Sequence, residues 1–336
     1  MSNDGTANTM ATTPAGEMAA VDSRRFVLAH LSDPHLPSPL SAPPWALSNK
    51  RLFGFLSWQL RRRRIHRIEV LQALKSDLDR QAADHLVVTG DIVNIALPNE
   101  FAAARRWLDT LGSPEVVTIV PGNHDAYVAV PWVRSLAQWG AFMCGDGQDD
   151  ASPDGFPFVR RRGPLALIGL STSAPTAPAL ASGTLGWRQI DAMSECLDRL
   201  KAEGRFRVLL IHHPPQPSTG ARRKQLTDAE AFRKAVSEVG AELVLHGHDH
   251  RFRFAELDGR DGPVPVFGVT SASALPKPER PGASYHLYAI ERGLDGWTLE
   301  LSIRRFDPAS GRFAAAEERA LSLPRRASEP VALPAQ

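Results

Sequence analysis

The sequence predicts an α/β (α+β) fold in which buried strands alternate with amphipathic helices. Two observations predict it: short apolar runs recur between polar or glycine-containing loops, and stretches with apolar residues at helical spacing lie between those runs. At 336 residues, with 43% hydrophobic and 23% charged residues, the chain is long enough for one large core or two modest ones. This alternation is typical of a layered α/β domain.

The strands and helices follow from these patterns in chain order. Buried strands are expected at 26–31, 85–89, 116–120, 165–170, 208–211 and 243–245. Helices are expected within 65–78, 101–111 and 187–200, where apolar residues recur three or four positions apart. After His250, four closely spaced strands at 251–255, 264–270, 284–290 and 298–306 indicate a largely antiparallel second sheet.

The two ends of the chain have a different composition from its middle. Residues 1–24 are rich in Ala, Thr and Gly and have no apolar run, which predicts a disordered leader and no signal peptide. Residues 25–306 are expected to form the domain, with an insertion at 37–66 that combines aromatic and basic side chains. Residues 307–336 are expected to be a partly disordered C-terminal tail.

Composition narrows the classes of function and the cellular compartment. The 39 basic and 37 acidic residues nearly balance, which argues against duplex nucleic acid as the partner. Cys144 and Cys196 are too few for a disulfide scaffold and too far apart for a thiolate metal site, so a reducing cytoplasm is expected. No apolar stretch approaches the roughly 20 residues of a transmembrane helix, although peripheral membrane contact stays open. The sequence indicates no oligomeric state.

Five of the predicted strands run directly into polar residues of similar chemistry. The residues that follow them are Asp33 and His35; Asp91; Asn123, His124 and Asp125; His212 and His213; and His246, His248 and His250. The carboxyl ends of strands are where ligand sites gather in α/β sheets. We therefore expect these side chains to share one site.

These side chains have the chemistry of a metal site. Carboxylate, imidazole and amide oxygen suit Mn, Fe or Zn, and no cysteine competes with them. In Asp33-x-His35 and His248-x-His250, positions i and i+2 of an extended chain share a face, so both side chains can point to one place. A carboxylate can bridge two metals, and Asp91 is the natural bridge. Each motif alone is also compatible with a turn, a cap or a buried histidine, but recurrence at five strand ends favours the metal site.

Together the motifs resemble those of the calcineurin-like metallophosphoesterase superfamily: D-x-H, G-D, G-N-H-D/E, H and G-H-x-H. The resemblance covers about residues 26–290, and it extends to the branch of class III cyclic-nucleotide phosphodiesterases. It implies a four-layer α/β/β/α sandwich of two mixed sheets flanked by helices, with a binuclear metal site at the strand ends. It also implies a phosphoric ester hydrolase that needs two divalent metal ions, Mn, Fe or Zn.

The resemblance also gives each motif residue a role. One metal would be bound by Asp33, His35, Asp91 and His250, and the other by Asp91, Asn123, His212 and His248. His124 corresponds to a histidine that assists the leaving oxygen or stabilises phosphoryl charge, and Asp125 is expected to orient it. Purple acid phosphatases have a tyrosine at the position of Asn94, so a tyrosinate-bound ferric ion is not expected here.

The implied reaction is attack of a metal-bridging hydroxide on phosphorus, in line with the leaving group. A small soluble phosphodiester is the favoured substrate, with a 3′,5′-cyclic nucleotide as the leading candidate. A hydrolase of lipid-linked pyrophosphate at the membrane surface and a non-catalytic metal-binding scaffold are the alternatives. Asn94, His213, Arg61 and Arg64 are the predicted substrate-binding residues. The aromatic and basic insertion could grip a nucleobase and phosphate, rest on anionic lipid, or pack on the core.

Overall fold

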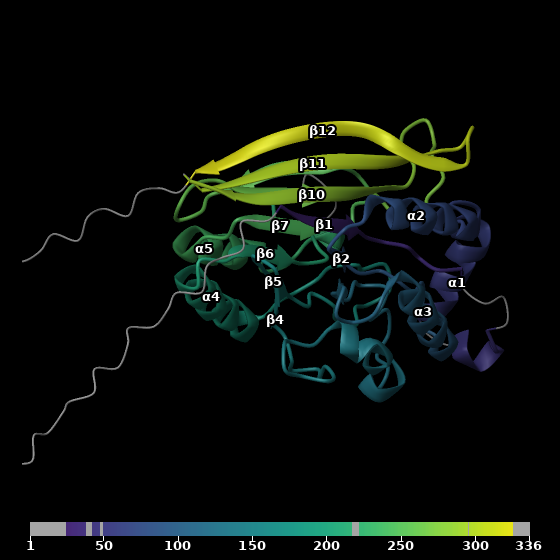
Figure 1. Cartoon of the computed structure of the whole chain (residues 1–336). Coiled ribbons are helices and arrows are strands. Elements are labelled where there is room, and N and C mark those ends of the chain that lie inside the picture. Colours follow the sequence, from purple (N-terminus) through teal and green to yellow (C-terminus); the bar gives the residue numbers. More distant parts are fainter. Residues whose placement is uncertain (1–24, 38–41, 48–49, 217–221, 295, 325–336) are drawn as a thin grey trace, which may run out of the picture.

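The computed structural model describes residues 25–37, 42–47, 50–216, 222–294 and 296–324. Two six-stranded mixed sheets lie against each other, and helices flank both of them (Figure 1). This arrangement confirms the predicted sandwich of two mixed sheets between helices. The predicted leader, residues 1–24, lies outside the described residues, as does the end of the predicted tail, residues 325–336.

The first sheet has the strand order β12-β11-β10-β1-β2-β3. Strands β1, β2 and β3 are parallel, and Leu31 pairs with Val88, which pairs with Ile119, so their carboxyl ends lie at one edge. The other three strands are antiparallel to their neighbours. The six strands are β1 (Phe26–Leu31), β2 (His85–Val88), β3 (Val117–Ile119), β10 (Ser284–Gly293), β11 (Gly296–Asp307) and β12 (Arg312–Pro324).

The second sheet has the order β4-β5-β6-β7-β9-β8. Its four central strands are parallel and fully buried, and the two edge strands β4 and β8 are antiparallel. Continuous apolar sequence is what a parallel strand covered on both faces requires. The six strands are β4 (Phe158–Arg162), β5 (Leu165–Gly169), β6 (Phe206–Leu210), β7 (Leu243–His246), β8 (Arg253–Leu257) and β9 (Val264–Gly268).

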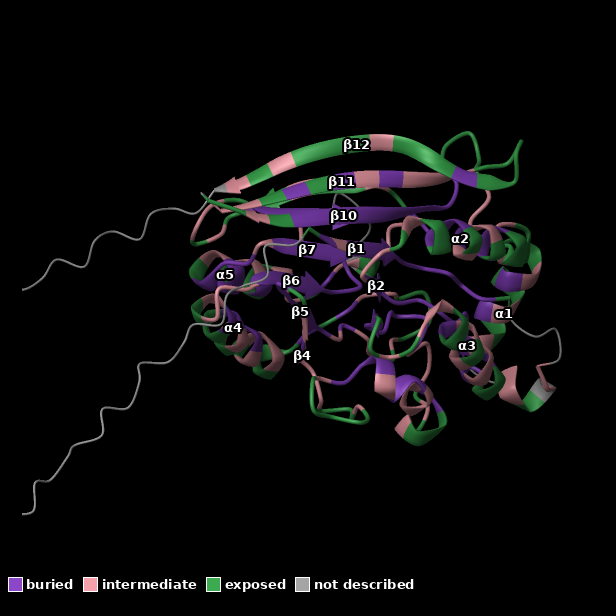
Figure 2. Ribbon diagram, in the orientation of Figure 1, coloured by how far each residue is buried: buried purple, intermediate pink, exposed green. Residues whose placement is uncertain are grey.

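Two hydrophobic clusters hold the layers together. The larger one joins the facing sides of the two sheets and continues under α2 and α3, and the smaller one lies between the second sheet and helices α4 and α5. Figure 2 shows the inner strands as buried and much of β12 as exposed. The helices are α1 (Lys50–Leu60), α2 (Ile68–Gln81), α3 (Pro98–Leu111), α4 (Trp187–Ala202) and α5 (Ala229–Val239), and the short 3-10 helices are η1 (Pro44–Leu47), η2 (Arg62–Arg64), η3 (Trp132–Arg134), η4 (Leu136–Phe142) and η5 (Arg222–Lys224). Within the described ranges, none of these helices is long and apolar enough to cross a membrane.

The structure corrects the prediction for the last quarter of the chain. The strands after His250 do not form a sheet of their own: β8 and β9 complete the second sheet, whereas β10 and β11 join the first. The reason is that β1 has an open edge, which β10 fills by antiparallel pairing from Phe26 with Ile290 onward. The sheet also continues through β12 to Pro324, beyond the predicted domain end at residue 306.

Candidate metal centre

The seven candidate metal ligands meet where strand ends of the two sheets face each other. Asp33 and His35 follow β1, Asp91 follows β2, and Asn123 follows β3 in the first sheet. His212 follows β6, and His248 and His250 follow β7, in the second sheet. Two layers that are distant in sequence therefore supply opposite halves of one site.

The first group of ligand atoms surrounds His250. Its Nε2 lies 3.2 Å from Nε2 of His35 and 3.0 Å from Oδ1 of Asp33. Nε2 of His35 lies 3.9 Å from Oδ1 of Asp33 and 3.9 Å from Oδ2 of Asp91. Four side chains therefore present donor atoms to one small volume.

The second group surrounds His212. Its Nε2 lies 3.2 Å from Oδ1 of Asn123, 3.3 Å from Nδ1 of His248 and 3.4 Å from Oδ2 of Asp91. Nδ1 of His248 is 2.9 Å from the same Asn123 oxygen. The two groups share Oδ2 of Asp91, while Oδ1 accepts a hydrogen bond from the His124 backbone at 2.7 Å. The carboxylate is thus oriented with one oxygen between the two groups.

The spacing of these atoms fits a pair of metal ions. Bonds of about 2.0 to 2.2 Å between a metal and N or O ligands place neighbouring ligand atoms roughly 3 to 3.5 Å apart. Most of the measured separations fall in that range. Two overlapping clusters that contain these ligands, Asp33 with His35 and Asp91, and Asp91 with His212 and His248, have donor atoms within 4.8 Å of one another.

Hydrogen bonds outside the site fix the histidine tautomers. Nδ1 of His35 donates to the Val93 carbonyl at 3.4 Å, and Nδ1 of His212 donates to the Thr89 carbonyl at 2.6 Å. In the neutral form of each ring Nε2 therefore carries the lone pair and lies among the donor atoms of the site, as in metal-bound histidines of other proteins. Burial holds the pKa of His35 and of His248 well below the usual value, which keeps both rings in the neutral form that binds metals.

Asp91 and His212 influence each other strongly in the absence of a cation. Burial lowers the pKa of His212, but the Asp91 carboxylate outweighs burial and raises that pKa to about 10. Burial raises the pKa of Asp91, but the charges of His212 and His124 outweigh it and hold that pKa well below its usual value. The pocket between them therefore attracts positive charge, which a divalent ion would supply in place of a proton.

The backbone at the ligands is in an unusual conformation. Asp33, His35, Asp91, His248 and His250 all have positive φ, between 38° and 69°. They are five of the eight non-glycine residues with positive φ in the described part of the chain. Non-glycine residues adopt this left-handed region rarely and at a cost in free energy, and such residues cluster at functional sites.

Backbone hydrogen bonds hold the two loops of the first sheet against each other. The amides of Asp33, His35 and Leu36 donate to the carbonyls of Gly90, Asp91 and Ile92 at 2.9 to 3.1 Å. This short ladder continues the parallel pairing of β1 and β2 past the strand ends. It keeps the ligands of the two loops side by side.

Asp125 is a structural anchor for the loop that carries the bridging ligand. Its Oδ2 accepts hydrogen bonds from the amides of Asp91 and Gly122, and its Oδ1 from those of Ile92 and Val93, at 2.8 to 3.0 Å. The prediction that Asp125 orients His124 therefore differs from the geometry, because both carboxylate oxygens serve backbone amides. Gly122 is required nearby, since a Cβ there would overlap Asp91.

His124 is paired with an arginine that the sequence prediction missed. Nη2 of Arg62 donates to Nε2 of His124 at 2.7 Å, while Nδ1 of His124 donates to the Asn94 carbonyl at 2.5 Å. The His124 ring stacks on Tyr127, with centroids 5.3 Å apart. Burial, with Arg62 beside the ring, lowers the pKa of His124 to about 3. At neutral pH the positive charge of this pair therefore resides on Arg62.

The predicted substrate-binding residues lie elsewhere or have other partners. Arg61 and Arg64 are exposed, and of this arginine run it is Arg62 that contacts His124. Asn94 is fully buried and donates to the Leu36 carbonyl. His213 is also buried, accepting from Thr172 and donating to the Ala181 carbonyl, so it supports the His248 ring, 4.4 Å away, and does not face solvent.

His66 is a further residue at the site that the sequence did not indicate. Its ring nitrogen lies with those of His35 and His250 in one cluster of donor atoms within 4.8 Å. Its Nδ1 makes a 2.8 Å hydrogen bond with Oγ of Ser273. A lone histidine after an arginine run carries no metal-binding pattern, so only the fold brings it here.

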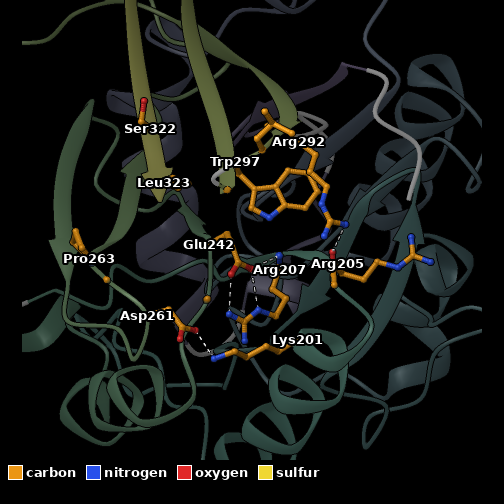
Figure 3. A pocket seen from close by; sticks show the side chains of 16 residues that line it. Lys201, Arg205, Arg207, Glu242, Asp261, Pro263, Arg292, Trp297, Ser322 and Leu323 are labelled. Carbon is orange, nitrogen blue, oxygen red and sulfur yellow. Dashed lines mark hydrogen bonds and ion pairs between the residues drawn. The ribbon is translucent and has the colours of Figure 1, made fainter. Parts of the chain in front are cut away.

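A separate pocket of about 530 Å³ lies at the opposite end of the second sheet (Figure 3). Its lining includes Arg205 before β6 and Glu242 before β7, together with residues of the β10–β11 turn and the end of β12, whereas the metal ligands follow β6 and β7. Four of its charged side chains form two ion pairs, Arg207 with Glu242 at 2.8 Å and Lys201 with Asp261 at 2.5 Å. None of the seven candidate ligands lines it, so it is not part of the metal centre.

Comparison with known proteins agrees with this geometry. A family model described as calcineurin-like phosphoesterase matches residues 26–252. The chain is 26% identical over 235 residues to the glycerophosphodiester phosphodiesterase GpdQ of Enterobacter lignolyticus, covering 69% of this chain and 73% of that protein. It is also 26% identical over 214 residues to a probable cyclic nucleotide phosphodiesterase of a Synechococcus species, covering 62% and 73%.

Solved structures share the fold at low sequence identity. A dimetal phosphatase from Danio rerio superposes with a TM-score of 0.56 at 14% identity, over 89% of this chain and 99% of that one. Purple acid phosphatase PPD1 from yellow lupin seeds gives a TM-score of 0.54 at 12% identity, over 90% of this chain and 54% of that one. These likenesses concern the fold alone.

Proposed function

The chain belongs to the calcineurin-like phosphoesterase family, a family of hydrolytic enzymes with two metal ions, and from this premise we propose that it cleaves a small soluble phosphodiester. The observation that carries the proposal is the pair of ligand groups joined through one oxygen of Asp91. Both relatives are named as phosphodiesterases, one for glycerophosphodiesters and one for cyclic nucleotides. The names of both relatives therefore support a phosphodiester as the substrate.

The proposed metal ligands follow the two groups. Asp33, His35, Asp91 and His250 would hold one divalent ion, and Asp91, Asn123, His212 and His248 the other. When bound, such a pair neutralises phosphoryl oxygens and makes a water molecule acidic enough to provide a nucleophile near neutral pH. Oxygen and imidazole ligands suit Mn, Fe and Zn.

Arg62 and His124 would handle the charge of the phosphoryl group. Arg62 presents a guanidinium beside the His124 ring, and its planar array of donors matches the geometry of phosphate oxygens. His124 has its Nδ1 proton committed to the Asn94 carbonyl, so its Nε2 can hold Arg62 by accepting a hydrogen bond. We assign the phosphoryl contact to Arg62 and the positioning of Arg62 to His124.

The reaction is tested with a substrate panel on protein loaded with Mn, Fe or Zn. The panel compares bis-p-nitrophenyl phosphate, p-nitrophenyl phosphate, a 3′,5′-cyclic nucleotide and a glycerophosphodiester. We expect the diesters to be hydrolysed faster than the monoester. Faster hydrolysis of the monoester would contradict the proposal, and inactivity on every substrate with two metals bound would favour a non-catalytic scaffold.

The role of Arg62 is tested by a matched pair of variants. Arg62→Gln should lower kcat/KM for bis-p-nitrophenyl phosphate by about 100-fold, the usual effect of removing one donor that stabilises transition-state charge. Arg61→Gln, the same change on the exposed neighbour, should leave it within about twofold, since surface changes away from special features have small effects. Equal losses in the two variants would refute the assignment.

A further inference from the structure

The outward face of α1 is apolar, which is the reverse of the usual pattern for a surface helix. Five residues of this helix are exposed: Leu52, Phe53, Leu56, Ser57 and Leu60. Four of the five are large apolar residues, with exposed fractions of 45%, 64%, 47% and 70%. Their spacing places them on one side of the helix, opposite the buried Gly54 and Trp58.

The four exposed apolar residues Leu52, Phe53, Leu56 and Leu60 form an apolar stripe. Exposed apolar residues are more concentrated here than elsewhere on the described surface. Twelve large apolar residues are exposed in the described part of the chain, and five of them lie between Trp45 and Leu60. Trp45, 79% exposed, is on η1, which contacts α1. A contiguous exposed apolar surface of this kind usually marks an interaction site.

The helix is fixed to the body of the protein by its other side. Nζ of Lys50 donates to Oγ1 of Thr176 at 2.8 Å and to the Leu180 carbonyl at 3.0 Å. Nε of Arg51 donates to the Ile95 carbonyl at 3.1 Å. The apolar stripe is therefore held outward at the rim of the molecule, where Figure 1 places α1.

The basic residues around the apolar stripe indicate which kind of surface it would bind. From residue 34 to residue 68 the chain has seven Lys and Arg residues and no Asp or Glu, although the whole chain is nearly balanced at 39 to 37. Lys50, Arg51 and Arg62 point into the protein, whereas Arg61, Arg63 and Arg64 are exposed just beyond the end of α1. Apolar side chains flanked by arginines match the boundary of an anionic bilayer.

We propose that α1 and η2 dock the protein on an anionic lipid surface. Phe53, Leu56 and Leu60 enter the boundary between headgroups and acyl chains, and Arg61, Arg63 and Arg64 lie against the headgroup phosphates. Because Arg62 in the same turn reaches His124, the docked face borders the candidate metal centre. The docking does not depend on the proposed hydrolysis, so the two can fail separately.

The test is flotation of the full-length, metal-loaded protein with two kinds of vesicle, equal parts of phosphatidylglycerol and phosphatidylcholine, or phosphatidylcholine alone. We expect binding to the anionic vesicles, and binding to the neutral ones that is weaker by at least tenfold. High salt should weaken the anionic binding, since surface charges are then screened. No binding to the anionic vesicles overturns the proposal.

Variants separate the apolar and the charged contributions. Arg61→Gln, Arg63→Gln and Arg64→Gln together should weaken binding about 100-fold, at about fivefold for each basic residue near an anionic surface. Phe53→Ser with Leu60→Ser should weaken it about tenfold or more. The matched control is Trp187→Ser on α4, a helix that packs on the second sheet. This change removes an aromatic side chain that is 72% exposed, and it should leave vesicle binding unchanged.

Two further measurements keep the outcomes distinct. Hydrolysis of bis-p-nitrophenyl phosphate and thermal unfolding should be unchanged in the stripe variants, which shows that they fold and that only docking is altered. Sedimentation velocity reports whether the stripe instead joins two copies of the chain. A dimer that Leu56→Ser dissociates, without vesicle binding, would overturn the lipid proposal in favour of a protein interface.

Discussion

Asp125→Asn replaces a buried carboxylate with an amide of the same shape, and it tests how the site is held together. Each carboxylate oxygen of Asp125 accepts hydrogen bonds from two backbone amides, four in all. In the variant, one oxygen becomes an NH2 group, which cannot accept, so two buried backbone donors lose their partner whichever way the amide is turned. At about 1 to 3 kcal/mol for each unsatisfied buried donor, the expected loss of stability is about 2 to 6 kcal/mol.

The assay is urea unfolding of the metal-free protein at pH 8, followed by metal analysis after reloading. Burial and the neighbouring Asp91 carboxylate raise the pKa of Asp125 to about 7, so pH 8 ensures that the wild-type residue is ionised. Because Asp125 anchors the amides of Asp91 and Gly122, the variant should also bind less than its full pair of metal ions. Stability and metal content are measured on the same preparation.

Asp228→Asn is the matched control. Asp228 also accepts backbone hydrogen bonds, from Leu185 and Gly186, but it lies at the start of α5 and only half-buried. This variant should lose less stability and keep its metal content. The reasoning is refuted if Asp125→Asn costs less than about 1 kcal/mol, or if both variants lose metal equally.

The remaining predictions concern the bridge, the fit of the loops and the response to acid. Asp91→Asn should reduce bound metal from two ions to fewer than one per chain, measured by elemental analysis, because the shared ligand loses its charge; retention of two ions would contradict the bridge. Gly122→Ala should likewise reduce metal content, since its Cβ would overlap Asp91, and an unchanged value would show that the loop yields easily. Burial lowers the pKa of His30, His85 and His286, so the folded protein favours their neutral forms. The stability that this preference contributes is fully present above the unfolded pKa of about 6.5 and is lost as the pH falls below it. In the metal-free protein each of these three rings should contribute a loss of about 1.4 kcal/mol between pH 8 and pH 5.5, and a flat urea-unfolding profile would exclude this explanation.

The ligand-bearing ends of the strands are predictable from sequence because parallel strands covered on both faces read as continuous apolar runs. Such a run ends where the chain leaves the core, so the polar residue that follows β2 or β6 stands out. The sequence of a strand does not show in the same way which other strands will pair with it. Apolar alternation identifies β10 as a strand but says nothing of its pairing with β1, because that pairing is decided by which sheet edge is open.

Arginines show the same limit at the level of single side chains. The sequence does not distinguish the three consecutive arginines 160–162, yet Arg160 is buried in β4 and donates to the carbonyls of Ala141, Cys144 and Val117. Arg62 is the one of the four arginines 61–64 that contacts His124. It does so because of the direction in which the short helix η2 turns after α1, which the sequence does not show. A run of identical residues carries no periodicity from which the inward position could be derived.

Backbone strain at the metal centre explains why its ligands come from tightly held loops. A non-glycine residue in the left-handed region costs roughly 1 kcal/mol or more, and five candidate ligands adopt it. The ladder from Asp33 to Leu36, the four amides on Asp125 and the 3.0 Å bond from the His248 amide to Asp33 offset that cost. Apart from Oδ2 of Asp33, which accepts from the His248 amide, these bonds use no candidate ligand side chain, and Oδ1 of Asp33 makes no hydrogen bond and stays available to a cation. The fold thus holds the donor atoms close together before any cation arrives, so little reorganisation should accompany binding, and weakening these backbone bonds should lower metal affinity even where every ligand is retained.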